Sequence, residues 1–279
     1  MGIFTATENL ITHPVRAKYY VLPDGTYKLA SVQAFNKPRF REQGWEQRQK
    51  KNGRSIILEG EEQEDIETGR EASTSDIERA TRRARKNAFD VIMCNPDMNV
   101  FATFTYAPDA VDNKASYDEC FKYLNTWLSN RVQRKGLKYV CVPERTKAGD
   151  IHFHAIMNHT ALRLRAAISP KTGLPLTHKG NALYNIADWD RGFTSAEFIR
   201  TRGEGEDERA AVSKYVFKYM GKQAGQKIGG RYCLIGGEIR RPVFAYGDSP
   251  EEFLDDGAAV YRNHVELPEG LTYDEWSFI

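Results

Sequence analysis

The sequence predicts an α+β fold, in which strands and helices are mixed within one compact domain. Residues 100–106 (VFATFTY) are aromatic and β-branched, which predicts a strand. Residues 116–136 carry apolar residues at helical spacing between a serine and a glycine, which predicts a helix. Residues 137–142 and 151–157 are two further apolar strands, and the short polar loop between them suits an antiparallel hairpin.

Capping signals mark the beginnings of two helices. Ser75 and Glu78 have the spacing of a capping box, and the apolar periodicity behind them predicts a helix from 75 to about 93. Ser116 and Glu119 repeat the same spacing before the second helix, which Gly136 ends. A third helix is expected over about 207–222.

The remaining elements are shorter. A hairpin is expected from strands 18–22 and 26–35, and further strands at 182–186, 193–199 and within 231–244. We therefore divide the chain into an N-terminal hairpin with a polar extension (1–74), a central domain that begins with a basic helix (75–245) and an acidic C-terminal tail (246–279).

Composition restricts the protein class. The 279 residues contain 40 basic and 38 acidic side chains, so nucleic-acid binding would have to come from local clusters of charge. The four cysteines are widely spread, which argues against a zinc knuckle or a disulfide framework. No stretch approaches the roughly 20 apolar residues of a membrane helix, and no signal peptide is apparent. We expect a cytoplasmic protein that does not contact a membrane.

His152 and His154 alternate with apolar residues along the strand 151–157, so both imidazoles should lie on the face opposite to those apolar side chains. Their Cα atoms would be about 6 to 7 Å apart, which allows both rings to bind one metal ion. If the two strands form a hairpin, Glu144 can add a carboxylate ligand. An incidental histidine pair is the alternative interpretation.

The predicted helix at 207–222 places Tyr215, Lys218, Tyr219 and Lys222 on one arc beside an apolar arc. A phenol can attack a phosphate once a metal, cation or base favours its phenolate, and a nearby lysine neutralises phosphate charge. Packing tyrosines and lysines with exposed ammonium groups would explain the same periodicity.

A second basic cluster lies on the helix predicted at 75–93, away from its apolar stripe. Arg79, Arg82, Arg83 and Lys86 together form a positive face of the kind that binds DNA phosphates, although a solvated helix face would have the same pattern.

Taken together, these motifs resemble the HUH endonuclease superfamily, and within it the rolling-circle replication initiators of small single-stranded DNA phages and related plasmids. Residues 101–105 (FATFT) look like the first family motif, His152-Phe153-His154 like the second, and 215–222 (YVFKYMGK) like the paired-tyrosine third motif. The resemblance covers roughly residues 85–245. It implies a central antiparallel sheet of ferredoxin/RRM-like type flanked by helices, with the central domain as the endonuclease.

The resemblance implies a nickase that cuts single-stranded DNA at a replication origin. Glu144, His152 and His154 would bind Mg²⁺ or Mn²⁺, and Tyr215 or Tyr219 would attack the scissile phosphate beside Lys218 and Lys222. The product would be a 5′-phosphotyrosine link and a free 3′-hydroxyl primer. The sequence has no phosphate-binding Gly-x-x-x-x-Gly-Lys-Ser/Thr loop, so a host helicase is expected to separate the strands. A host polymerase is the expected partner that extends the primer, and the expected location is a bacterial cytoplasm.

Three alternatives remain open at this point. A relaxase or transposase of the same superfamily would share the chemistry and differ in its biological use. A noncatalytic regulator would bind origin DNA without cutting it, and a zinc-dependent hydrolase would cut DNA without a covalent link to protein.

Overall fold

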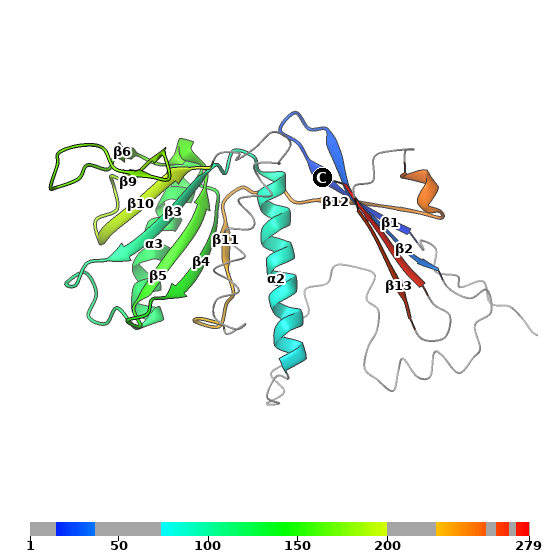
Figure 1. The fold of residues 1–279 in the computed structure, drawn as a ribbon, viewed down its shortest axis with the longest axis horizontal. Helices are drawn as coiled ribbons and strands as arrows, with labels where there is room; N and C mark the ends of the chain where they lie inside the picture. Colours follow the sequence, from blue (N-terminus) through cyan, green and yellow to red (C-terminus); the bar gives the residue numbers. More distant parts are fainter. Residues whose placement is uncertain (1–14, 37–73, 200–226, 255–260, 268–271, 279) are drawn as a thin grey trace, which may run out of the picture. The chain divides into compact units, whose positions relative to one another are not determined.

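The computed structural model describes residues 15–36, 74–199, 227–254, 261–267 and 272–278. The chain divides into two compact units (Figure 1). The larger unit spans residues 20–28 and 73–243, and the smaller contains the described parts of 1–19, 29–72 and 244–279. The expected third helix at 207–222 lies outside the described residues.

A seven-stranded antiparallel sheet forms the centre of the larger unit, which confirms the predicted α+β class. Its strand order is β11-β4-β5-β3-β10-β9-β6. The strands are β3 (Val100–Tyr106), β4 (Tyr139–Arg145), β5 (Ile151–Met157), β6 (Leu164–Ala166), β9 (Tyr184–Ile186), β10 (Gly192–Phe198) and β11 (Leu234–Gly236). A separate two-stranded sheet pairs β7 (Thr177–His178) with β8 (Asn181–Ala182).

The middle of this sheet is a split β-α-β unit. Strands β3 and β4 are joined through the helix α3 (Tyr117–Lys135), and β5 lies between them, antiparallel to both. Ser116 caps α3 by accepting a hydrogen bond from the Glu119 amide. Gly136 ends the helix with a φ of 65°, a left-handed conformation that favours glycine. This arrangement agrees with the ferredoxin/RRM-like fold that the family resemblance implies.

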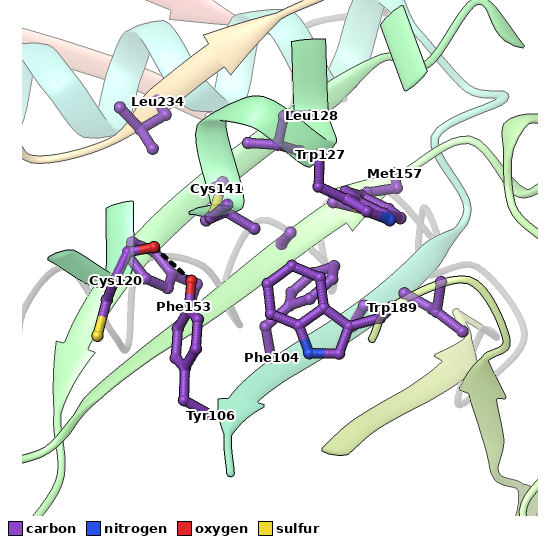
Figure 2. Packing of buried hydrophobic residues seen from close by; sticks show 14 of the residues in the cluster. Phe104, Tyr106, Cys120, Trp127, Leu128, Cys141, Phe153, Met157, Trp189 and Leu234 are labelled. Atoms are coloured by element: carbon purple, nitrogen blue, oxygen red, sulfur yellow. Dashed lines mark hydrogen bonds between the residues drawn. The ribbon is translucent and has the colours of Figure 1, made fainter. Parts of the chain in front are cut away.

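The face of the sheet that packs against α3 forms the main core of the larger unit (Figure 2). Phe104, Trp127 and Trp189 pack edge to face, with ring centroids 5.1 to 6.0 Å apart. The hydroxyl of Tyr106 donates a hydrogen bond to the Cys120 carbonyl, shown as a dashed line in Figure 2. Because Phe104 and Phe153 point to this face, the residues before and after them on each strand point to the opposite face.

Helix α2 (Thr74–Cys94) packs on part of that opposite face. Its Ala88, Val91 and Ile92 form a second cluster with side chains of β4 and β5, namely Val140, Val142 and Ile156. The helix has nearly the predicted bounds. No helix in the described ranges is long and apolar enough to cross a membrane.

The smaller unit contains a five-stranded sheet of order β12-β1-β2-β14-β13. The strands are β1 (Val15–Val21), β2 (Tyr27–Asn36), β12 (Val243–Gly247), β13 (Tyr261–Glu266) and β14 (Thr272–Ser277). The expected N-terminal hairpin is thus present as β1 and β2. The C-terminal segment, predicted to be a tail, instead supplies β13 and β14. Every residue of β14 pairs with β2. The short 3₁₀ turns η1 (His159–Ala161) and η2 (Pro250–Glu252) complete the described elements.

Candidate active site

Three of the predicted site residues lie on one face of the β4–β5 hairpin. Glu144 is the register partner of His152, and Val142 is the partner of His154, so all these side chains point to the same side of the sheet. The hairpin loop is closed by a hydrogen bond from the Thr146 amide to the Asp150 carbonyl, 2.9 Å long. Two imidazoles and one carboxylate therefore lie on the same face of the sheet, and α2 packs on another part of this face.

Glu144 and His154 are in direct contact. The distance from Oε2 of Glu144 to Nε2 of His154 is 2.5 Å, so a short hydrogen bond joins the two side chains. The His154 side chain is only 8% exposed and that of Glu144 15% exposed, so water screens this contact weakly.

The other nitrogen of His154 is held from the neighbouring strand. Thr103 on β3 is the register partner of His154, and its Oγ1 lies 3.0 Å from Nδ1 of the imidazole. The hydroxyl can donate to a bare ring nitrogen or accept from a protonated one. The ring of Phe101 stacks parallel to the imidazole, with centroids 5.8 Å apart. His154 is thus fixed at both nitrogens and across one face of its ring.

His152 lies closer to solvent than His154 does. Burial lowers the pKa of its imidazole, and the positive charge of Lys114 lowers it further, while Glu144 and Asp150 oppose this change. Lys114 and Asp150 themselves form an ion pair of 3.1 Å beside the hairpin loop. A neutral imidazole is the form that binds a metal ion.

The donor set fits a divalent cation in its chemistry. Imidazole and carboxylate ligands together suit Mn²⁺ and related ions, and carboxylate alone suits Mg²⁺. Within the described ranges no three His, Cys, Asp or Glu side chains are already arranged around a common point for a metal. Glu144 and His154 bond to each other instead. Glu144, His152 and His154 thus lie together on one sheet face, and their metal-binding role remains a prediction.

The other predicted site residues have different positions. Arg82, Arg83 and Lys86 are exposed on α2, whereas Arg79 forms an ion pair of 3.3 Å with Asp76 on the same helix. Tyr215, Lys218, Tyr219 and Lys222 lie outside the described residues.

Sequence reasoning did not assign Thr103, Lys114 or Asp150 to this site. Thr103 lies within residues 101–105, which resemble the first family motif, but the motif gives this residue no role of its own. The contact of Thr103 with His154 depends on the pairing of β3 with β5. In the sequence α3 and β4 lie between these two strands, so no local pattern encodes the pairing.

A comparison with protein families supports a link to DNA replication. The sequence model of the replication-associated protein ORF2/G2P family matches residues 99–224, which include β3, the Glu144–His154 pair and the Tyr215–Lys222 segment. No curated protein and no solved structure gives a significant match. The match is consistent with a replication initiator and extends over the part of the chain that carries the candidate site.

Proposed function

We propose that this protein is a rolling-circle replication initiator that nicks single-stranded DNA at an origin through a tyrosine. The single observation that carries the proposal is that Glu144, His152 and His154 lie on one sheet face, within the segment that matches a replication-associated family. Metal-assisted phosphoryl transfer uses such a site to orient a phosphate for in-line attack.

The three side chains would hold the cation, with His154 already oriented by Thr103 and Phe101. A bound Mg²⁺ or Mn²⁺ supplies Lewis-acid polarisation of a phosphate oxygen. With a cation bound, Glu144 would give up its hydrogen bond to Nε2 of His154 and ligate the cation instead, and the N–H at Nδ1 of the imidazole would donate a hydrogen bond to the hydroxyl oxygen of Thr103.

The nucleophile in this proposal is the phenolate of Tyr215 or Tyr219. Its oxygen forms a bond to phosphorus, the bond from phosphorus to the 3′-oxygen breaks, and that oxygen takes up a proton to become the 3′-hydroxyl. The protein is left joined to the 5′ side of the cut. The reverse reaction, with a 3′-hydroxyl as attacking group, religates the strand.

Lys218 and Lys222 would neutralise the charged phosphate, and the basic residues of α2 would bind the strand outside the site. The 3′-hydroxyl can prime synthesis by a host polymerase, with strand separation by a host helicase. The second tyrosine would allow a second cut after one round of replication.

The test is a covalent adduct. Purified protein with Mn²⁺ is mixed with labelled single-stranded DNA from the origin of its own replicon, and denaturing gels detect DNA that stays attached to protein. We expect an adduct from the unaltered chain, a reduced yield from Tyr215→Phe or Tyr219→Phe, and none from the double variant.

Two other outcomes discriminate the alternative functions. Binding of the cognate strand without any cleavage would replace the proposal with a noncatalytic regulator. Cleavage that leaves no protein on the DNA and survives the double tyrosine substitution would instead indicate a metal-dependent hydrolase. His154→Ala serves as the control for metal dependence, because the adduct should then disappear while both tyrosines remain.

A further inference from the structure

A two-tipped arm extends from the edge of the larger sheet, far from the candidate active site. It runs from Arg163 at β6 to Asn185 within β9, and Figure 1 shows it (light green) projecting past these strands. Backbone hydrogen bonds tie its segments together, since the Ala167 amide donates to the Leu183 carbonyl and the Leu183 amide to the Leu176 carbonyl. One tip is the turn at 169–174, and the other joins β7 to β8. We call residues 163–185 the basic arm.

The basic arm has an unusual charge. No acidic residue occurs between Asp150 and Asp188, and the arm carries four cations, all exposed: Arg163, Arg165, Lys171 and Lys179. None of the four forms an ion pair with a carboxylate in the described part of the chain. The one carboxylate contact of the arm there joins Glu197 on β10 to His178, at 3.4 Å. In a protein with nearly balanced charge, this segment presents unneutralised positive charge to solvent.

The tip between β7 and β8 is a tight turn with a strained lysine. Lys179 and Gly180 have φ angles of 49° and 83°, the pattern of a type I′ hairpin turn. Asparagine or aspartate is the usual residue at the first of these positions, because a β-carbon is disfavoured at positive φ. In the described ranges, Lys179 is the one residue other than glycine with positive φ. Backbone strain of this kind is concentrated at functional positions.

The other tip also carries an exposed lysine, without positive φ at that residue. Lys171 lies in the turn that ends at Gly173, and the neighbouring Leu174 is 64% exposed. A lysine therefore lies at each tip of a narrow β-structured projection. Lysine side chains are among the groups that contact phosphate oxygens of DNA.

We propose that the basic arm binds the sugar–phosphate backbone of the DNA strand several nucleotides away from the cleaved phosphate. The proposal rests on DNA being the substrate, as proposed above. Charge complementarity selects the partner, since exposed lysines and arginines without acidic neighbours favour a polyanion. Contacts of this type position the strand and carry no sequence information.

The sheet order sets how far the arm lies from the site. His154 is on β5, and three strands (β3, β10 and β9) separate β5 from β6 at the base of the arm. At about 4.8 Å per strand, the arm begins roughly 19 Å from β5. This distance corresponds to five or six stacked nucleotides at about 3.4 Å, the rise of one strand in a duplex. The arm would therefore hold flanking DNA without contacting the reacting atoms.

The experiment measures the affinity of the full chain for fluorescent origin single-stranded DNA by anisotropy, over a range of salt concentrations. The test variant is Lys171→Gln with Lys179→Gln. The matched control is Lys122→Gln with Arg134→Gln, which removes the same charge from exposed positions on α3. This helix packs on the sheet face opposite to His152 and His154.

If each tip lysine neutralises one phosphate, the slope of log K against log salt falls by about 1.4 in the test variant, at about 0.7 per contact for a single strand. The affinity at 0.15 M salt should fall by about tenfold. The control variant should keep the slope of the unaltered chain. Equal changes in both variants, or no change in either, would overturn the proposal.

A second variant separates binding from folding. Lys179→Asn places a residue that tolerates positive φ in the strained turn, so the melting temperature should rise or stay constant while DNA affinity falls. A lower melting temperature with unchanged affinity would overturn the assignment of Lys179 to DNA binding.

The adduct assay distinguishes this proposal from the proposed cleavage. A smaller salt slope in the arm variant, with no adduct from any variant, would retain the arm as a DNA-binding surface and reject the nickase. An adduct that forms normally, together with an unchanged salt slope in the arm variant, would retain the nickase and reject the arm.

Discussion

The hydroxyl of Thr103 lies 3.0 Å from Nδ1 of His154, on the side of the imidazole opposite to its contact with Glu144. The two residues are directly opposed across β3 and β5, so the backbone register fixes their separation. Thr103 is therefore a positioning residue for His154. Groups that bond to the outer nitrogen of a metal-binding histidine set the tautomer and orientation of its ring.

Replacing Thr103 with valine keeps the shape of the side chain and removes the hydroxyl. We expect the Mn²⁺ affinity to fall by about tenfold to a hundredfold, because His154 loses the group that orients its ring. Isothermal titration with Mn²⁺ measures this directly, and Thr103→Ser should restore most of the affinity. Thr105→Val, on the same face of β3, is the control and should bind Mn²⁺ normally. Equal losses in both variants would indicate a general effect on the strand.

Glu144→Gln tests the carboxylate ligand. The amide can still accept a hydrogen bond from His154, so the fold should be retained, but the negative charge that attracts a cation is lost. We expect Mn²⁺ binding to weaken strongly, together with a loss of adduct formation, while the melting temperature changes by only a few degrees. Unaltered Mn²⁺ affinity in this variant would remove Glu144 from the ligand set.

The basic face of α2 makes a separate prediction. Arg82→Gln with Arg83→Gln removes two exposed cations, and the affinity for single-stranded DNA should fall with a salt slope smaller by about 1.4. Arg79→Gln is an internal control on the same helix, because Arg79 forms an ion pair with Asp76, which competes with a phosphate for its guanidinium. Fluorescence anisotropy measures all these variants. The prediction would be contradicted if Arg79→Gln lowered the affinity for single-stranded DNA more, for each charge removed, than the double substitution of Arg82 and Arg83.

Local patterns were sufficient for the elements around the candidate site. Aromatic and β-branched residues predicted β3, and alternation of apolar residues predicted β5, both with the bounds they have. Ser116 and Gly136 marked the ends of α3. The hairpin of β4 and β5 also follows from its short loop, so the meeting of Glu144 with His154 could be anticipated. These features depend on residues close together in sequence.

Features that depend on distant pairing could not be read in the same way. Strand β14 pairs with β2 although more than two hundred residues separate them, so the C-terminal segment was predicted to be a tail. The Thr103–His154 contact was missed for the same reason. The turn at Lys179 was missed because a lysine is rarely found at positive φ and gives no turn signal.

A buried carboxylate in the smaller unit makes the stability of this unit depend on pH. Asp274 on β14 is only 4% exposed and accepts hydrogen bonds from His264 at 2.8 Å, Arg262 at 3.2 Å and Asn36 at 3.1 Å. The hydrogen bond from His264 is the largest of the effects that lower the pKa of Asp274, and Arg262 contributes in the same direction.

A carboxyl group whose pKa is lower in the folded state stabilises the fold above its unfolded pKa of about 3.9. This stabilisation is lost as the pH falls through the folded pKa, when protonation removes the acceptor for Arg262 and His264. We therefore expect the melting temperature of the unaltered chain to fall between pH 5 and pH 2 more steeply than that of Asp274→Asn. At pH 7 the same substitution should lower the melting temperature, since an amide is a weaker partner for these donors.

Asp248→Asn, at an exposed position in the same unit, is the matched control and should follow the unaltered chain. Parallel melting curves for Asp274→Asn and the unaltered chain over this pH range would show that Asp274 contributes no pH-dependent stability.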